Sequence, residues 1–394
     1  MSEVLHYFKN NRGGLTAAAL PFGLETLISE WSALVPHMAR NRHEAFSRAE
    51  WAYLITFLEE SFLRQTVEGA LGEPAQSSAG AVTRLLRPRG QVAVWLPNNV
   101  SLLGPLSLIL ISLTGNPAVI RGGSRSENLT RYFIEFALAF LPAGVLRHYL
   151  EGRVKVVDFP RDDPRHREMA EESRVRVVFG SDASARAIDS LPHPADSIGF
   201  SFIDRQSEAW IEAGAATDST LEVLIRVLAV YGRAGCTSPQ KVVVPGGSRE
   251  DAVELCERLA ALWPLAVRGD VERHVASENV KCSQWASALG WEPVMAARNG
   301  AVFAAGDFGL PPFTGAMALP VVHGSAEEAV LHLPPNIQTV GYALLAPADE
   351  IWLALLSRTR IKRFVPVSRM HHFGPVWDGF SFWRSMFEEV EILR

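Results

Sequence analysis

Cys236 is the residue best suited to covalent chemistry. It stands in the loop RAGCTSPQ, between a predicted amphipathic helix and the predicted strand KVVVPG. Gly232 and Gly235 permit unusual backbone angles and close approach of a substrate, and Arg233 would favour the thiolate. A thiolate attacks a thioester carbonyl with little help from a base. The loop therefore predicts a nucleophile, and the alternative is a small, buried core residue.

The remaining cysteines and a histidine pair carry weaker signals. Cys256 lies inside the helical pattern DAVELCERLA and is predicted to pack in the core, and Cys282 follows a lysine in a polar stretch. Neither CxxC nor zinc-finger spacing occurs, so no metal site is expected. Three cysteines make a sparse disulfide framework, which predicts a reducing, cytoplasmic compartment. His371 and His372 are candidate acids or bases, although a structural role in an aromatic tail is favoured.

Polar residues follow three predicted strands. The turn Pro97-Asn98-Asn99 closes the first, and its amides are able to donate to a developing oxyanion, although asparagine also simply favours turns. Arg121, followed by two glycines and Ser124, ends the second strand and would meet a ribose phosphate or remain a solvated strand-end cation.

Gly180 and Ser181 end the third of these strands and open a helix, where backbone N–H groups hold phosphates well. No GxGxxG follows, so this is not the usual dinucleotide fingerprint.

Alternating strands and helices surround these residues. From residue 91 onward, strand patterns such as QVAVWLP, AVIR, VKVVDF and VRVVFGS alternate with helical ones, and the alternation begins again near residue 216. This predicts α/β architecture with two doubly wound, mostly parallel sheets, which bind ligands at the carboxyl ends of their strands. Residues 14–70 have helical spacing, LGEPAQSSAGAVTRLLRPRG is expected to be a connection, and the aromatic tail needs a surface to cover.

Composition excludes several classes. A chain of 394 residues predicts two to three domains, and a net charge of −5 gives no reason to expect nucleic acid or an anionic membrane as partner. The N-terminus lacks the apolar core of a signal peptide. The apolar run 102–120 approaches the length of a membrane span, but its Pro105 and the turn GNP favour a buried helix, a turn and a strand.

In this order, the segments resemble the aldehyde dehydrogenase superfamily. The residues that carry the resemblance are VAVWLPNNVSLLGPLSLILISLTGNPAVIRGGS, VVFGSDASARAI and GRAGCTSPQKVVV, within a match over roughly residues 90–394. The run Cys-Thr-Ser-Pro-Gln and the tail VSRMHHFGPVWDGFSF are most similar to the fatty acyl-CoA reductases of bacterial bioluminescence systems.

The resemblance implies roles for ranges and residues. It implies a helical N-terminal region (1–90), a nicotinamide-cofactor-binding domain (91–215), a catalytic cysteine domain (216–358) and a C-terminal return and oligomerisation segment (359–394). By position, Cys236 is the acyl-accepting nucleophile and Asn99, or its neighbour Asn98, the oxyanion donor. The cofactor residues are then Arg121, Ser124, Gly180 and Ser181.

Two departures from the superfamily pattern bear on function. The segment that carries a water-activating Glu in hydrolytic members is here DSIGF (196–200), without a Glu, which disfavours oxidation of an aldehyde to a free acid. The Glu-x-Phe-Gly-Pro motif that positions the nicotinamide ribose is replaced by FTGAMALPVV (313–322). Cofactor binding is therefore expected to be altered.

The resulting hypothesis is reduction of an acyl-CoA or acyl-carrier-protein thioester to an aldehyde. NADPH is the expected cofactor, because Arg121 would pair with its 2′-phosphate, and NADH is the alternative. Competing hypotheses are aldehyde oxidation, cysteine-based acyl transfer without redox chemistry, and a binding or scaffold role. The resemblance also implies a homodimer or homotetramer. Acyl chain, carrier and cofactor preference are not predicted by the sequence.

Overall fold

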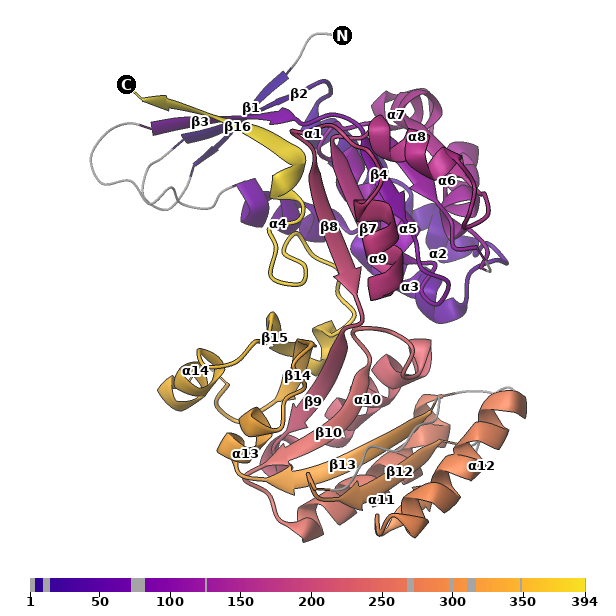
Figure 1. Ribbon diagram of the computed structural model, residues 1–394, viewed down its shortest axis with the longest axis vertical. Coiled ribbons are helices and arrows are strands. Elements are labelled where there is room, and N and C mark those ends of the chain that lie inside the picture. The colour runs from indigo at the N-terminus through magenta and orange to yellow at the C-terminus, as the bar shows by residue number, and fades with distance from the viewer. Residues whose placement is uncertain are drawn as a thin grey trace. The chain divides into compact units, whose positions relative to one another are not determined.

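The chain folds into two compact units. The computed structural model describes residues 4–9, 15–71, 82–124, 126–267, 273–297, 301–309, 317–347 and 349–393. Unit 1 comprises residues 1–203 and 373–394, and unit 2 comprises residues 204–372. Each unit contains its own parallel sheet flanked by helices (Figure 1).

Unit 1 holds two sheets and most of the helices. Its strands are β1 (Val4–Lys9), β2 (Leu15–Leu20), β3 (Val82–Pro88), β4 (Val92–Trp95), β5 (Ala118–Arg121), β6 (Val154–Val157), β7 (Val175–Gly180), β8 (Ile198–Ile203) and β16 (Phe387–Leu393). Its α-helices are α1 (Leu24–Ser32), α2 (Val35–Arg40), α3 (Arg48–Phe57), α4 (Glu60–Leu71), α5 (Leu103–Ser112), α6 (Leu129–Phe140), α7 (Val145–Arg153), α8 (Arg165–Glu171) and α9 (Asp182–Asp189).

The parallel sheet of unit 1 has the order β6-β5-β4-β7-β8. The chain starts in the middle with β4, runs outward to β6 and returns to the other side of β4 with β7. The order therefore reverses between the adjacent strands β4 and β7, where doubly wound sheets bind ligands. Residues of α8 and α9 join the apolar core on one face of this sheet, and α5 packs against β5.

The apolar run 102–120 is a helix, a turn and a strand, as predicted. All ten residues of α5 are buried, and Gly115 takes the positive φ of 71° that the turn before β5 requires. No helix within the described ranges has the length and apolarity needed to cross a membrane. The run is apolar because protein surrounds it on all sides.

The N-terminal region, predicted to be helical over residues 1–90, contains α1–α4 but also strands. Within residues 1–90, strands β1, β2 and β3 join β16 in a four-stranded sheet of order β1-β2-β3-β16. Part of the predicted connection 71–90 is β3, which pairs antiparallel with β16 in the register Arg87–Glu388, while residues 72–81 lie outside the described ranges. β3 itself has no strong apolar alternation, and it is a strand because it pairs with two segments distant in sequence, β2 and β16.

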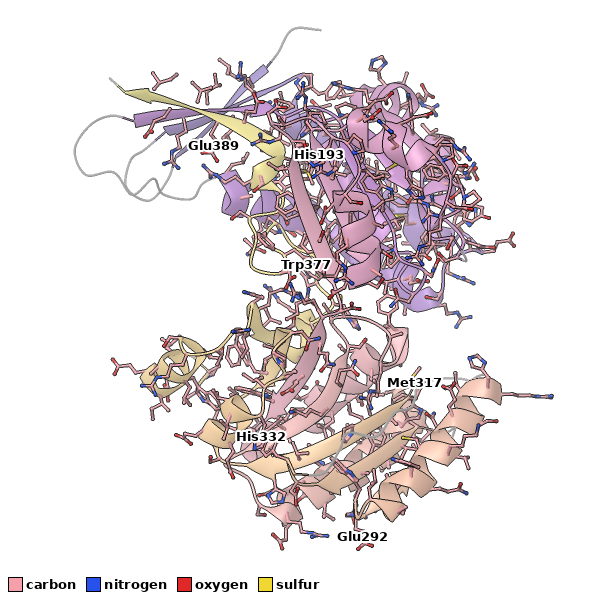
Figure 2. The ribbon with its side chains drawn as sticks, in the orientation of Figure 1. His193, Glu292, Met317, His332, Trp377 and Glu389 are labelled. Carbon is pink, nitrogen blue, oxygen red and sulfur yellow. The ribbon has the colours of Figure 1, made fainter. Side chains whose placement is uncertain are left out.

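The C-terminal tail returns to unit 1 and buries most of its aromatic side chains there, although Phe380 is exposed. Trp383 is fully buried and donates from Nε1 to the Leu110 carbonyl at 2.6 Å. The buried Asn116 amide donates to the Met386 carbonyl at 3.0 Å and accepts from the Gly90 N–H at 2.8 Å. One side chain in the α5–β5 turn thus joins the segment just before β4 to the C-terminal tail. Figure 2 labels Trp377 and Glu389 on the tail.

Unit 2 is built around one seven-stranded sheet of order β11-β12-β13-β10-β9-β14-β15. Only the β11–β12 pair is antiparallel among its strands. The strands are β9 (Gln206–Ile211), β10 (Pro239–Pro245), β11 (Val294–Ala296), β12 (Val302–Gly306), β13 (Ala318–Gly324), β14 (Ile337–Ala343) and β15 (Arg363–Pro366). The helices are α10 (Asp218–Tyr231), α11 (Arg249–Ala266), α12 (Arg273–Ala288), α13 (Ala326–Leu331) and α14 (Glu350–Leu356).

Helices cover both faces of the unit 2 sheet. One apolar cluster takes its helical members from α10 and α11, and the other takes them from α12, α13 and α14. Two buried faces agree with the nearly continuous apolar runs of its central strands. The expected doubly wound arrangement is thus present in this unit.

The unit boundaries differ from the expected limits at 215 and 358. Unit 2 begins at Asp204 because β9, which showed no strand signal in the sequence, lies in its sheet between β10 and β14. Glu208 stands inside β9 and interrupts the apolar pattern, although the fold buries it. At the other end, β15 remains in unit 2 and the chain leaves only after His372. The functions expected for the ranges stay predictions.

Candidate active site

Cys236 occupies a tight turn between α10 and β10. The Ser238 N–H donates to the Gly235 carbonyl at 3.0 Å, which makes Cys236 and Thr237 the two central residues of the turn. Gly232 ends α10 with a φ of 54°. A Cβ on Gly235 would lie 2.8 Å from Ser238 Oγ and 3.2 Å from the Tyr231 Cβ. Both glycines thus have steric reasons to be glycine, apart from any role toward a substrate.

Two hydrogen bonds with side chains outside the turn hold its central residues, Cys236 and Thr237. Ser207 of β9, itself fully buried, donates from Oγ to the Cys236 carbonyl at 2.7 Å. The Thr237 hydroxyl lies 2.7 Å from His371 Nδ1. On the other side of the ring, His371 Nε2 lies 2.7 Å from the Val227 carbonyl of α10. The turn is therefore tied to a strand, a helix and the end of the unit 2 chain.

These two anchors escaped the sequence analysis. Ser207 was overlooked because β9 was not recognised as a strand. The contact of Thr237 with His371 joins residues 134 positions apart, and no local pattern contains it. The sequence signals were a polar residue beside the predicted nucleophile and His371 itself, a candidate acid or base for which a structural role was favoured.

Arg233 is tied to two strands of the unit 2 sheet by hydrogen bonds. Its Nε donates to Gln240 Oε1 at 3.0 Å and its Nη1 donates to the Ala318 carbonyl at 3.2 Å. Burial lowers the pKa of this guanidinium, and the thiol whose charge acts on it is Cys282. Arg233 thus links the cysteine loop to β10 and β13, and its expected effect on the Cys236 thiolate stays a prediction.

Exposure separates Cys236 from the other cysteines. Cys236 is partly exposed, whereas Cys256 and Cys282 are buried. Cys256 lies on the buried face of α11 and packs in the core as predicted, and burial raises its pKa. Burial also raises the pKa of Cys282, to about 11. Both buried thiols are protonated at neutral pH and unsuited to attack.

The polar residues of unit 1 lie at the carboxyl ends of three adjacent strands. Asn99 follows β4, Ser124 follows β5, and Gly180 and Ser181 end β7, with Asn99, Ser124 and Ser181 exposed. Two of these loops are in close contact, since a Cβ on Gly123 would lie 2.5 Å from the Pro97 carbonyl oxygen. Ser181 caps α9 by accepting the Ser184 N–H at 3.3 Å. The fold thus gathers all the residues predicted for cofactor binding at one edge of one sheet.

Arg121 is more enclosed than the sequence suggested. Only 7% of it is exposed, its Nη2 donates to the Phe159 carbonyl at 2.6 Å, and its guanidinium lies 5.5 Å from the Phe159 ring centre. Its buried Nε makes no hydrogen bond within the described part of the chain. Burial lowers the pKa of Arg121, opposed by the charge of Asp158. This arginine is not a solvated strand-end cation.

The predicted site residues are divided between the units. Asn99, Arg121, Ser124, Gly180 and Ser181 belong to unit 1, and Cys236 belongs to unit 2. The stretch without the water-activating Glu, 196–200, leads into β8. In the other departing stretch, residues 313–316 lie outside the described ranges, and Ala318–Val322 belong to β13.

Comparison with protein families gives a match over residues 32–303 to the family described as acyl-CoA reductase (LuxC). The matched residues are well over half of the chain and include Cys236 and all five predicted unit 1 residues.

The chain belongs to the acyl-CoA reductase (LuxC) family.

This acyl-CoA reductase family member is therefore an enzyme with the fold of the aldehyde dehydrogenase superfamily. An oxidoreductase from Marinobacter aquaeolei has a similar structure, with a TM-score of 0.68, 14% identity, and 95% of this chain and 87% of that chain covered. A protein described as a putative aldehyde dehydrogenase from Burkholderia cenocepacia is also similar in structure. Its TM-score is 0.64 at 16% identity, with 94% of this chain and 85% of that chain covered.

A 1-pyrroline-5-carboxylate dehydrogenase from Thermus with bound NAD gives a TM-score of 0.62, 12% identity, and coverage of 95% of this chain and 82% of that chain. At these identities the structural likenesses establish the fold only. A comparison with curated protein sequences found no match.

Proposed function

We propose that this acyl-CoA reductase family member reduces an acyl thioester, carried by coenzyme A or by an acyl-carrier protein, to an aldehyde through an acyl group on Cys236. The Cys236 thiolate attacks the thioester carbonyl, the bond from that carbon to the carrier sulfur breaks, and the carrier thiolate leaves and takes up a proton. When bound, a nicotinamide cofactor supplies the hydride. Cys236 then leaves as a thiolate and the aldehyde is released.

The observation that carries the proposal is the setting of Cys236. It is the partly exposed member of three cysteines, lies in a turn held on both sides, and falls within the stretch that matches the acyl-CoA reductase family. A nucleophile needs both access and a fixed position. Neither buried thiol meets the first requirement.

Two donors are proposed for the oxyanion that forms during attack, the Cys236 N–H and the Asn99 side-chain amide. Removing one such donor typically costs about 3–4 kcal/mol of transition-state stabilisation. Asn99 is assigned this role by its place in the Pro-Asn-Asn turn after β4, and Asn98 is the alternative donor.

The strand ends of unit 1 suit a nicotinamide dinucleotide. The β5 and β7 ends flank the first strand of a sheet whose order reverses there, and the backbone at Gly180 and Ser181 opens a helix. The related fold of the Thermus dehydrogenase is described with bound NAD. NADPH remains our first choice, but Arg121 is already bonded to the Phe159 carbonyl, so titration with both cofactors must decide.

Intact-mass analysis tests the proposal. The protein is incubated with a panel of acyl-CoAs of different chain length, with and without NADPH or NADH. We expect the mass of one acyl group to appear on wild-type protein, to be absent from Cys236→Ala, and to disappear with release of aldehyde when the cofactor is added. Wild-type protein that never acquires an acyl group would refute the proposal.

The same measurement separates two competing functions. Acyl loading that a cofactor does not reverse, together with transfer to an added amine or thiol, would indicate acyl transfer without redox chemistry. An aldehyde-dependent rise in NAD(P)H absorbance without coenzyme A would indicate aldehyde oxidation. The absence of a Glu from residues 196–200 counts against that reaction.

We also propose a homodimer or homotetramer. The four-stranded sheet of unit 1 ends in β16, an edge strand able to pair with another chain, and Ile392 on this strand is 39% exposed. Light scattering coupled to gel filtration is expected to give two or four times the 43.3 kDa mass of one chain. A monomer at micromolar concentration would contradict this assignment.

A further inference from the structure

The hydroxyl of Thr237 and the imidazole of His371 form a directed pair beside the nucleophile. His371 Nε2 faces the Val227 carbonyl oxygen, which only accepts, so Nε2 carries the ring hydrogen. In a neutral ring the other nitrogen is then an acceptor, and the Thr237 hydroxyl donates to Nδ1 across 2.7 Å. Both ring nitrogens are engaged in holding other groups.

The neutral ring is the stable form in this position. Burial is the main reason that the pKa of His371 is lowered to about 4, and the charge of Arg363 lowers it further. The Tyr231 ring also lies against His371, with the ring centres 5.3 Å apart, and its neighbour His372 has a lowered pKa as well. Nδ1 is therefore an acceptor throughout the physiological pH range.

The segment that presents His371 is fixed from within unit 2. Arg363 on β15 donates to the carbonyls of Arg369, Met370 and His372 at 3.1, 3.0 and 2.8 Å. The Met370 side chain fills the space above Gly341 of β14, where a Cβ would lie 2.3 Å from the Met370 sulfur. A side chain at residue 341 would displace this segment. The backbone that carries the His371 imidazole is thus fixed by hydrogen bonds and packing within unit 2.

We propose that His371 is a positioning residue for Cys236, acting through the Thr237 hydroxyl to hold the turn in the geometry for attack on the acyl carbonyl. This rests on the proposed function of Cys236. In this role His371 acts through Thr237, and its occupied ring nitrogens make it a poor choice for the general base. The reaction it supports is formation of the acyl–Cys236 bond.

The experiment is a double-mutant cycle on acyl loading. Single-turnover loading of Cys236 by an acyl-CoA is followed by mass spectrometry without cofactor, over a range of acyl-CoA concentrations. The variants are Thr237→Val, which removes the hydroxyl but keeps the shape, Thr237→Ser, which keeps it, His371→Leu, and the double variant Thr237→Val/His371→Leu. Alkylation of Cys236 by iodoacetamide is measured in parallel.

A matched control is Thr359→Val in the same unit. The Thr359 hydroxyl, like that of Thr237, donates one hydrogen bond, here to the Leu356 carbonyl at 2.8 Å. This control measures what the loss of one local hydroxyl bond does to loading when it lies away from the turn. We expect its loading rate to stay within about twofold of wild type, because surface-type local bonds contribute little.

We expect the maximal loading rate of Thr237→Val to fall about tenfold, because a small misplacement of a reacting group slows the chemical step. The half-saturating acyl-CoA concentration should change little. The double variant should be no slower than the slower single variant, and Thr237→Ser should recover most of the rate. Loading by Thr237→Val at the wild-type rate, or additive losses in the double variant, would overturn the inference.

A different outcome is possible in which wild-type protein is alkylated by iodoacetamide but never loads an acyl group. The proposed function then fails, and the double-mutant cycle on alkylation rates alone decides the inference. Non-additive changes in alkylation rate would support it, and unchanged or additive rates would refute it.

Discussion

Replacing Cys236 by alanine should lower the rate of acyl-CoA-dependent cofactor oxidation by about 10³-fold or more. Loss of a nucleophile removes the covalent route, and single substitutions of that kind in other enzymes reduce kcat by several powers of ten. A 10³-fold loss corresponds to about 4 kcal/mol in the activation free energy. The measurement is steady-state oxidation of NADPH or NADH at saturating acyl-CoA.

The matched control is Cys282→Ala. Cys282 is buried in α12 and its pKa is raised to about 11 by burial, so it is unsuited to act as a nucleophile. This variant should keep the wild-type rate within about twofold at a temperature where it is folded, as expected for a small core change. Comparable losses in both variants would point to general damage to unit 2. A Cys236→Ala enzyme with the wild-type rate would refute covalent catalysis.

The second large effect is expected at the buried ion pair of unit 2. Lys241 Nζ lies 2.9 Å from Glu208 Oε1, and the side chain of Glu208 is only 2% exposed. Trp210 Nε1 donates to the other carboxylate oxygen at 3.3 Å. Lys241 also donates to the carbonyl of His332, the residue after α13 that Figure 2 labels.

Lys241→Met should destabilise unit 2 by about 3–5 kcal/mol, because it leaves a buried carboxyl group without its cation. The measurement is the free energy of unfolding in urea, with hydrogen exchange of the β9 and β10 amides as the probe of unit 2. Arg226→Met is the control, since Arg226 pairs with Glu222 at 2.8 Å but is exposed, and it should cost less than about 1 kcal/mol.

The deficit of Lys241→Met should depend on pH. Burial is the largest influence on Glu208 and raises its pKa, opposed by Lys241. A carboxyl group with a raised pKa in the folded state contributes most below its unfolded pKa, and this contribution is lost as the pH rises through the folded pKa. The variant should thus lie closest to wild type at a pH below the ordinary pKa of a glutamate, and furthest from it at a pH above the raised folded pKa of Glu208. An equal deficit at both pH values would exclude an uncompensated Glu208 charge as its cause.

Local sequence patterns determined the core of the fold. The helix predicted from STLEVLIRVLAVYG is α10, the run REDAVELCERLAALW is α11, and the apolar run 102–120 divides into α5, a turn and β5. These elements are recognisable because burial on one face, or on all faces, sets the spacing of apolar side chains within a single element. The same locality placed Cys236 in a glycine-containing loop between a helix and a strand.

Long-range pairing was decided only by the tertiary structure. β3 became a strand through β16, in the register Arg87–Glu388, and β9 was hidden by Glu208, whose charge is tolerated inside a sheet because Lys241 reaches it from β10. Arg233 and Arg121 each direct one guanidinium nitrogen to a main-chain carbonyl, and no local pattern predicts those partners. Side-chain direction depends on neighbours that the chain brings in from elsewhere.

The sequence by itself therefore singled out Cys236 as the residue that we propose forms the acyl bond, and it indicated the helix and the strand that carry it. The tertiary structure decided what holds that residue, since Ser207 and His371 reach the turn from a strand and a tail that are 29 and 134 positions away from their partners. Periodicity reports the burial of a segment over a few residues. A hydrogen bond between distant segments depends on the whole path of the chain between them, and no short pattern encodes that path.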